Sequence, residues 1–241
     1  MIKISYNIYF NNKSNEDLGI EVVKRPFIPI PKRKIKTIDV DGHDGSYYVD
    51  EETYEDIVIT IEFNFVENDL NNIRNKVRNI KFWLENIDEN KLKLDDDRSF
   101  YYNVKNLEIE NFNYEELYEI QKFTINFIVE PYQYINFSKR EKPLYNNSFV
   151  TNDWYLSKPV YRIVGNGDCN LIVNGTTINC NVDKELIIDT EHDKILDKDR
   201  NYAIGKTNIK YMQDLYLKHG RNNYTWTENF KIYYIPNYRV I

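Results

Sequence analysis

The side chains that most often carry out catalysis or bind metals are few in this sequence. Its three histidines are His43, His192 and His219, and no two of them have a metal-ligand spacing such as HExxH. The aspartate-rich stretch over 39–50 resembles a calcium loop, but Asp44 and Asp50 occupy the positions that need Gly and Glu. No G-x-S-x-G, P-loop or Rossmann glycine pattern occurs either. The sequence therefore predicts no enzyme, no catalytic residue, and no bound metal or cofactor.

A run of three carboxylates is the most concentrated charge in the sequence. Asp95, Asp96 and Asp97 are followed by Arg98 and lie between two strand-like segments, KLKL and SFYYNV. We predict that this run forms the tip of a hairpin, because three adjacent carboxylates are too costly to bury.

Two aromatic residues could stack against a sugar ring. Tyr224 and Trp226 are two positions apart in a strand-like NYTWTE segment, so both side chains lie on the same face. They could form a platform for a carbohydrate, or they could pack into the core of a β-sandwich. The second interpretation is favoured, because aromatic residues are common in such cores.

The two cysteines of the chain are related by a predicted turn. Asn174-Gly175 is the strongest short hairpin signal known, and it is flanked by the apolar stretches LIV and TTI. A two-residue turn places Cys169 directly opposite Cys180, with Cα atoms about 5.5 Å apart. That spacing could accept a disulfide, but we favour free thiols in a protein made in the cytoplasm.

These residues must be positioned by strands and by one helix, and the clearest pattern runs from Ile57 to Leu84. The first ten residues alternate and place five apolar side chains on one face: Ile57, Ile59, Ile61, Phe63 and Phe65. Apolar residues then recur three or four positions apart: Leu70, Ile73, Val77, Ile80 and Leu84. The sequence therefore predicts a strand followed by a helix over about 68–86, capped by Asn68, that buries its stripe on a sheet.

The rest of the chain is typical of β structure. We predict strands at 2–9 and 18–24, an extended connector at 25–36, a turn within 39–49, and an alternating strand over 117–130 that stops at Pro131. Residues 132–158 have no clear period. After Pro159 come seven short strands, with turns at 165–167, 174–175 and 219–220. We therefore predict a first domain over 1–135, a linker over 136–158 and a β-sandwich or barrel over 159–241.

Charge and hydropathy exclude some classes of protein. The net charge is −6, and residues 1–140 carry 26 acidic and 19 basic side chains. This balance argues against a general phosphate-binding surface, because affinity for DNA comes largely from Lys and Arg. No apolar run is long enough to span a bilayer, and the first ten residues lack the features of a signal peptide. We expect synthesis in a bacterial cytoplasm and no membrane contact.

The order of these segments resembles the distal tail proteins (the Dit family) of long-tailed bacteriophages. In the first half, the segments that carry the resemblance are DLGIEVVKRPFIPIP (17–31), the turn and strand over 40–63, a helix ending in WL, LKLDDDRSFYYNV (92–104) and VEPYQY (129–134). In the second half they are KPVYRIVGNGDCNLIVNG (158–175), ELIIDTEHDKI (185–195) and LKHGRNNYTWTENFKIYYIPNYR (217–239). The resemblance covers nearly the whole chain.

The resemblance implies a mainly β protein with two domains, an N-terminal ring-forming sheet or sandwich domain with one helix and a C-terminal galectin-like β-sandwich. It also implies a structural role in the virion as a hexameric baseplate hub. Such a ring joins the tail tube protein to the tail-tip protein, lets DNA pass, and carries receptor-binding proteins on its C-terminal domains. The alternatives are the equivalent component of a contractile tail or phage-tail-like bacteriocin, and a carbohydrate-binding adsorption protein.

Two further hypotheses follow if the chain forms such a ring. We expect Asp95, Asp96 and Asp97 to line or approach the passage, because acidic side chains repel the phosphates of DNA. We expect strand edges of the first domain, including residues 2–9, to pair between neighbouring subunits, because unpaired edges favour such contacts.

Overall fold

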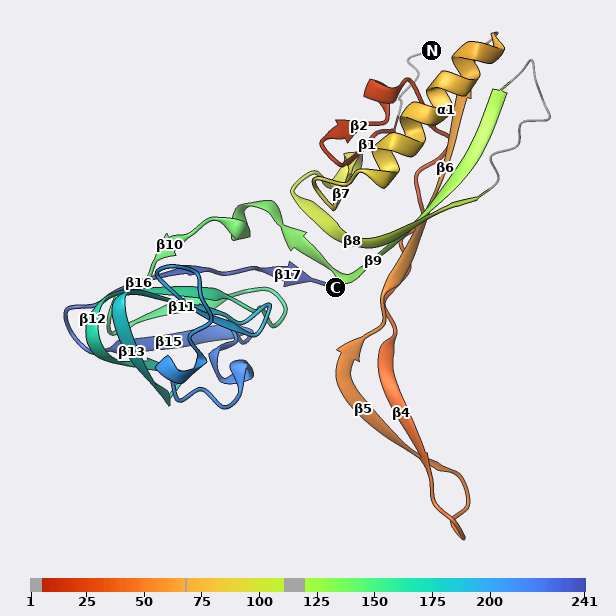
Figure 1. Ribbon diagram of the computed structural model, residues 1–241. Helices are drawn as coiled ribbons and strands as arrows, with labels where there is room; N and C mark the ends of the chain where they lie inside the picture. The colour runs from red at the N-terminus through yellow and green to blue at the C-terminus, as the bar shows by residue number, and fades with distance from the viewer. Residues whose placement is uncertain (1–5, 68, 111–119) are drawn as a thin grey trace. The chain divides into compact units, whose positions relative to one another are not determined.

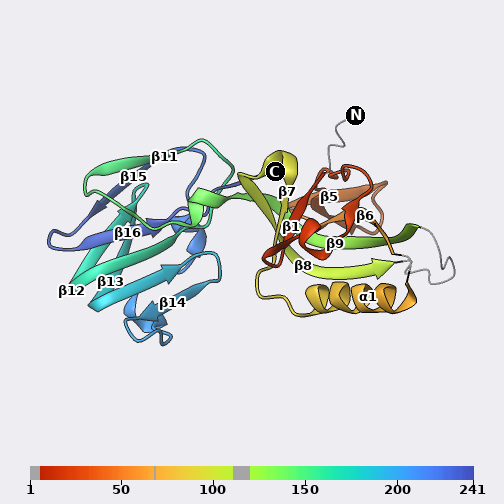
Figure 2. The same cartoon turned by 90° about the horizontal axis from the view of Figure 1, so that it is seen from above.

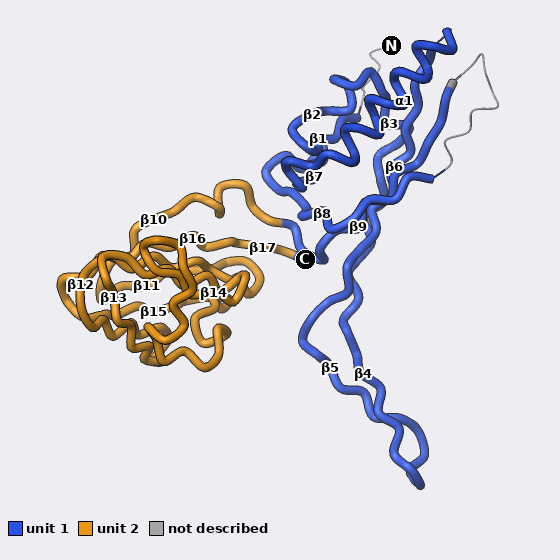
Figure 3. Tube along the Cα trace, in the orientation of Figure 1, with its two compact units in different colours: residues 1–133, 241 blue, residues 134–240 orange. Residues whose placement is uncertain are grey.

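The computed structural model describes residues 6–67, 69–110 and 120–241, which belong to two compact units (Figure 3). Unit 1 comprises the chain up to Gln133 together with Ile241, and unit 2 comprises Tyr134–Val240. The fold is mainly β with one α-helix among the described residues, as predicted. In that part of the chain, no helix has the length and apolar character needed to cross a membrane.

The main sheet of unit 1 surrounds the strand that the alternation predicts. Its strand order is β2 (Lys13–Ser14), β1 (Ile8–Phe10), β7 (Lys91–Leu94), β8 (Phe100–Glu110), β9 (Ile120–Ile135), β6 (Ile57–Val66) and β3 (Glu21–Val22). Every second residue of β6 is buried from Ile57 to Phe65, which confirms the predicted apolar face. β6 pairs with β9 along its whole length, and the rings of Phe63 and Phe123 stack at 5.2 Å.

The predicted helix is α1 (Leu70–Glu85), and it runs along the sheet of unit 1 (Figure 2). Asp69 is its N-cap, since its carboxylate accepts hydrogen bonds from the backbone N–H groups of Asn71 and Asn72. The expected cap, Asn68, lies outside the described residues. Most of the predicted stripe is buried, together with Trp83, but Leu70 is 38% exposed. The predicted stripe is therefore wrong by one residue at the N-terminal end.

A separate two-stranded sheet begins within the segment that we expected to be a connector. β4 (Arg33–Asp39) and β5 (Ser46–Tyr54) form an antiparallel hairpin that extends from one end of β6 and β9 (Figure 1). The predicted turn lies between these strands, where Gly42 and Gly45 both have a φ of +80°. The prediction of an extended connector over 25–36 is wrong for its last four residues, because residues 33–36 are part of β4.

The N-terminal strands are shorter than predicted and are paired within the chain. Residues 2–5 lie outside the described residues, and β1 begins at Ile8. β1 pairs with β2 on one side and with β7 on the other, so residues 8–10 present no free edge to a neighbour. A short 3₁₀ turn, Glu16–Leu18, precedes β3. β9 continues beyond Pro131, whose missing N–H costs nothing in the ladder with β6 because that ladder ends at Val129.

Unit 2 is built on one long hairpin. β12 (Val160–Val173) and β13 (Thr176–Asp189) pair without a break and meet at the predicted Asn174-Gly175 turn, where both residues have positive φ. The remaining strands are β10 (Lys142–Pro143), β11 (Ser148–Asn152), β14 (Lys194–Asp197), β15 (Gly220–Trp226), β16 (Lys231–Ile235) and β17 (Arg239–Val240). Short 3₁₀ turns lie at Asn136–Lys139, Ile204–Lys206 and Met212–Leu215.

Three predictions for the second half need correction. Residues 165–167 do not form a turn, because they pair with Lys184–Val182 inside the long hairpin. One of the seven short strands predicted after Pro159, the segment IKYMQDLYL at 209–217, instead holds the 3₁₀ turn Met212–Leu215. Residues 136–158 belong to unit 2 and are not a linker, since β10 pairs with β16 and β11 pairs with β15. Periodicity missed these two strands because both are short and only partly buried.

Candidate assembly surfaces

The β4–β5 hairpin exposes apolar side chains on both of its faces. The register opposes Ile38 to Tyr47 and Lys36 to Val49, so Ile38, Tyr47 and Val49 share one face. Ile35 and Tyr48 lie on the other face, where they are 56% and 73% exposed. Every residue of β4 is exposed, as are the inner seven of β5. A two-stranded hairpin is marginally stable in water, and the described residues leave the apolar side chains of this one uncovered.

The base of the hairpin is held by its own chain. The Arg33 guanidinium forms an ion pair with Asp50 and lies over the Tyr54 ring at 5.6 Å. The pKa of Asp50 is lowered, first because its carboxylate accepts the backbone N–H of Glu52 and second because of Arg33. The Glu55 N–H donates to the carbonyl of Lys32 at 2.8 Å and closes the base.

The tip of the hairpin is acidic. We define the tip as residues 39–45, which contain Asp39, Asp41 and Asp44. The hydroxyl of Ser46 donates to Asp39 at 2.6 Å, which leaves the charge of that carboxylate uncompensated. The described residues show no ion pair at Asp41 or Asp44, and all three carboxylates are exposed. The three carboxylates give the tip a formal charge of −3.

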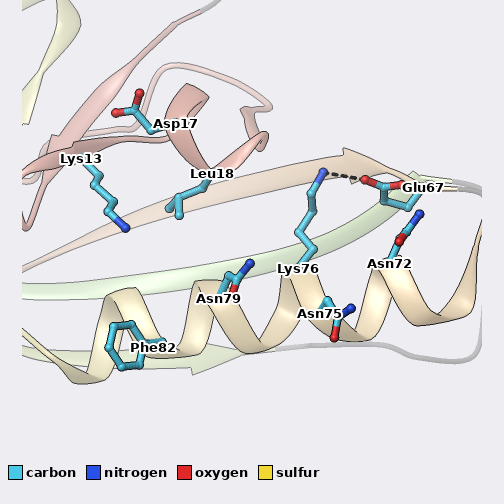
Figure 4. Close-up of a pocket in the computed structure, with 9 residues that line it drawn as sticks. All are labelled: Lys13, Asp17, Leu18, Glu67, Asn72, Asn75, Lys76, Asn79 and Phe82. Atoms are coloured by element: carbon cyan, nitrogen blue, oxygen red, sulfur yellow. Dashed lines mark ion pairs between the residues drawn. The ribbon is translucent and has the colours of Figure 1, made fainter.

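One exposed side of α1 faces a polar groove (Figure 4). Residues from α1 line it together with others from β2, the 3₁₀ turn at 16–18 and Glu67: Lys13, Asp17, Leu18, Glu67, Asn72, Asn75, Lys76, Asn79 and Phe82. Lys76 forms a 3.0 Å ion pair with Glu67 and donates to the carbonyl of Gly19 at 3.2 Å. Asp17 accepts hydrogen bonds from the backbone and hydroxyl of Ser14. Much of the charge in this groove is thus already engaged.

The opposite exposed side of α1 is basic. At 100° per residue, Arg74, Arg78 and Lys81 lie within a narrow arc, and Leu70 borders it. We call these four residues the basic flank. Arg78 donates to the amide oxygen of Asn75 at 3.0 Å, and no ion pair involves Arg74, Arg78 or Lys81 among the described residues. The flank therefore presents three exposed cations that form no ion pair with any described residue of their own chain.

The acidic run Asp95–Asp97 forms a 3₁₀ turn that connects β7 to β8, at the end of a hairpin as predicted. Two of its three charges are compensated locally, because Asp95 pairs with Arg98 and Asp96 pairs with Arg25. The hydroxyl of Tyr6 donates to Asp96 at 2.6 Å, and with Arg25 it lowers the pKa of that carboxyl.

Asp97 accepts a hydrogen bond from the amide of Gln133 at 2.9 Å. With Arg25 and Arg98 included, the formal charge around this turn is close to −1. The turn is therefore a weaker source of negative potential than three free carboxylates would be. Among the described residues, no group of three or more His, Cys, Asp or Glu side chains is placed to hold a metal ion.

Tyr224 and Trp226 lie in the core of unit 2. Their side chains are 1% and 7% exposed. Tyr224 and Tyr161 are joined by a hydroxyl hydrogen bond of 3.1 Å, and the indole N–H of Trp226 donates to the carbonyl of Phe230. A carbohydrate platform needs exposed ring faces, which these two buried rings do not present. The core interpretation fits the burial, and the platform interpretation does not.

Cys169 and Cys180 are opposite each other across β12 and β13, as the turn predicts. Both are buried, free thiols. Burial raises the pKa of Cys169 to about 11 and that of Cys180 to about 12, so neither is a reactive thiolate at neutral pH.

Sequence reasoning missed the hairpin and the basic flank as surfaces. The signal for the hairpin was present, because RKIKTID and SYYVDEETY have the composition of strands. The three nearby prolines and the glycine-rich turn, however, are typical of an irregular connection, so the sequence predicted a connector and a turn there. The helical pattern places Arg74 and Arg78 on the polar side of the helix, but a pattern does not reveal which exposed charges lack partners.

Comparison with known proteins gives an independent view of both units. Residues 16–129 match the family model of the phage tail protein RIFT-related domain. The structure is similar to that of the SPP1 Dit protein, described as a paradigm of hub adsorption apparatus in phages that infect Gram-positive bacteria. That likeness has a TM-score of 0.68 at 13% identity and covers 95% of this chain and 97% of the other.

A structure of the phage P2 baseplate in its activated conformation with Ca matches with a TM-score of 0.48 and 7% identity, over 98% of both chains. No curated protein sequence matches the chain. The family match lies within unit 1, and the likeness of fold extends over both units.

Proposed function

We propose that this chain is a structural protein of the phage tail and baseplate, of the Dit hub family, and that six copies close into a ring around the passage for DNA. The family match over residues 16–129 and the likeness of fold to a Dit hub protein support this proposal. The ring joins the tail tube to the tail-tip protein, works without catalysis, and reaches the virion after synthesis in the cytoplasm of the host. The observation that carries this proposal is the β4–β5 hairpin, whose apolar side chains no other described part of the chain covers. A second copy of the chain is the simplest cover.

A ring needs two different complementary surfaces on each subunit, because every contact is head to tail. Unit 1 supplies surfaces that differ in shape and chemistry, namely a projecting hairpin on one side and an exposed helix on the other (Figure 1). The hypothesis that residues 2–9 form the contact is not carried forward for residues 8–10, since these are paired within their own sheet.

We propose that unit 2 is galectin-like and carries receptor-binding proteins or other baseplate components. Support comes from exposed apolar side chains in its irregular segment between β14 and β15. Tyr202, Ile204 and Tyr211 are each more than 60% exposed. Side chains of this kind on one short segment are typical of a protein interface.

We also propose that residues 95–97 face or approach the passage. Asp97 contributes most to the repulsion of phosphates there, because it accepts a hydrogen bond from the neutral amide of Gln133, whereas Asp95 and Asp96 each pair with an arginine. Assembled rings of the triple variant Asp95→Lys, Asp96→Lys and Asp97→Lys should retain DNA at low salt, whereas wild-type rings should not. A matched control variant reverses the charge of three acidic side chains of unit 2, with Asp193→Lys, Asp199→Lys and Glu228→Lys. Equal DNA retention by both triple variants would contradict the placement.

The ring is tested by changing one face of the hairpin. The triple variant Ile38→Ser, Tyr47→Ser and Val49→Ser removes the apolar side chains of that face and leaves the Arg33–Asp50 ion pair at the base intact. Wild-type protein should form particles of six times 29.1 kDa, about 175 kDa by light scattering, and the triple variant should be a folded monomer.

The control carries three serine substitutions at exposed apolar positions of unit 2, namely Tyr145, Phe149 and Tyr211. It should keep the mass of the wild type. If the free wild type is monomeric, electron microscopy of assembled tails replaces light scattering. Tails whose tip holds no ring of this protein would contradict the proposed function.

A further inference from the structure

We propose that the hairpin tip of one copy docks on the basic flank of α1 of a second copy. The tip carries Asp39, Asp41 and Asp44, and the flank carries Arg74, Arg78 and Lys81. This inference rests on the proposed function, because it identifies the two surfaces that meet between subunits.

The charges of the two surfaces are opposite and equal in number, and the part of the chain that the structure describes leaves them uncompensated. The described residues give these six side chains no ion pair, and the hydrogen bonds of Asp39 and Arg78 are to the neutral partners Ser46 and Asn75. Other charged side chains of unit 1 do find partners, as Lys24 does with Glu62 and Lys105 with Asp56. Charges left without partners on two separate surfaces are what a complementary interface requires.

The two surfaces cannot satisfy each other within one chain. The hairpin extends from the end of β6 and β9 that lies away from α1 (Figure 1). β4 has seven residues, which at about 3.3 Å per residue carry the tip roughly 20 Å beyond its base. The tip therefore reaches outward to a different molecule, and the contact is head to tail, as a closed ring requires.

An apolar contact accompanies the charges. Leu70 lies beside Arg74 on the flank and is 38% exposed, although the helix pattern predicts it to be buried. Ile38 and Tyr47 oppose each other next to the tip, and both are exposed. Docking of the tip on the flank would bring these side chains to Leu70 and cover them together.

The polar groove on the other side of α1 fits this occupant poorly. Its Lys76 is already held by Glu67 and by the carbonyl of Gly19, and its carboxylates would repel an acidic tip. The basic flank is therefore favoured over the groove as the site of docking.

Charge reversal with rescue tests the inference. One variant carries Asp41→Lys and Asp44→Lys, and a second carries Arg74→Glu and Lys81→Glu. Each should weaken self-association by about tenfold or more, because like charges then meet across the contact. Combining the four substitutions restores opposite charges and should recover association to within about threefold of the wild type. The control is Asp193→Lys with Asp199→Lys in unit 2, which should change little.

The readout is the mass of the protein by light scattering over a range of concentrations and salt. Where the free wild type is a monomer, the same variants are tested by the yield of assembled tails. Rings that form normally with either pair reversed, or reversed pairs that do not rescue each other, overturn this inference and leave the ring itself standing. Absence of a ring in wild-type tails overturns the proposed function.

Discussion

The indole N–H of Trp83 donates a 2.9 Å hydrogen bond to the backbone carbonyl of Phe10, which ties the end of α1 to β1. The two rings also meet edge to face, with centroids 5.7 Å apart. The side-chain amide of Asn11 adds hydrogen bonds to the carbonyls of Trp83 and Asn86, both at 2.7 Å. The C-terminal end of the helix, which leaves carbonyls unsatisfied, is thus completed by the first strand.

Trp83→Phe should destabilise unit 1 by about 1–3 kcal/mol, because the carbonyl of Phe10 loses its partner in a buried place. Trp83→Ala should cost about 3–5 kcal/mol, since it also leaves a cavity. Phe82→Ala is the matched control, because the neighbouring Phe82 side chain is 65% exposed and should change stability little. Urea unfolding measures all three. Equal losses for Trp83→Ala and Phe82→Ala would contradict the account.

Gly165→Ala should destabilise unit 2. A Cβ atom at Gly165 would lie 2.3 Å from Cδ1 of Phe230, which is too close for any carbon pair, so the ring must move. Overpacking of this kind costs about 1–3 kcal/mol. Gly205→Ala serves as the control, since a Cβ there meets no atom within 4 Å. In thermal unfolding, the added substitution Phe230→Ala should recover part of the loss; no recovery would show that the ring is not the obstacle.

The buried thiols predict a loss of stability at high pH. Folding raises the pKa of Cys169 to about 11 and of Cys180 to about 12, whereas an unfolded thiol ionises near pH 8.5. Between these values the unfolded chain releases protons that the folded chain keeps, so stability falls as pH rises above about 8.5. The slope is at most about 1.4 kcal/mol per pH unit for each thiol.

The double variant Cys169→Ala with Cys180→Ala removes this slope while retaining the contribution of buried tyrosines such as Tyr161. The difference between the urea unfolding curves of the two proteins, measured from pH 8 to 10.5, therefore isolates the thiols. Parallel pH dependence in the two proteins would contradict the burial of the pair.

Tyr6→Phe should raise the pKa of the Asp96 carboxyl. The hydrogen bond from the Tyr6 hydroxyl is the largest cause of its lowered pKa, ahead of Arg25. A depressed carboxyl pKa contributes stability at neutral pH that is lost as pH falls through the folded value, and the variant should lose less of it on acidification. Titration by carbon NMR measures the carboxyl directly. Arg98→Ala, which removes the partner of Asp95, should leave Asp96 nearly unchanged.

The sequence by itself determined the elements whose pattern is local. The alternation over Ile57–Val66 and the helical stripe after it correspond to β6 and α1. Burial of one face imposes a period of two residues on a strand and of 3.6 residues on a helix. The Asn174-Gly175 turn likewise determined that Cys169 faces Cys180, since a two-residue turn sets the register of everything beyond it.

Only the tertiary structure decided which surfaces are left open. The glycines at 165 and 167 predict a turn, yet both are paired within the continuous ladder between β12 and β13. Asp95 and Asp96 read as free charges, but Arg98 and the sequence-distant Arg25 compensate them, whereas nothing in the described chain compensates Asp41, Asp44 or Lys81. Pairing of charges and cover of apolar faces depend on residues far apart in the chain, and a local pattern carries no information about those neighbours.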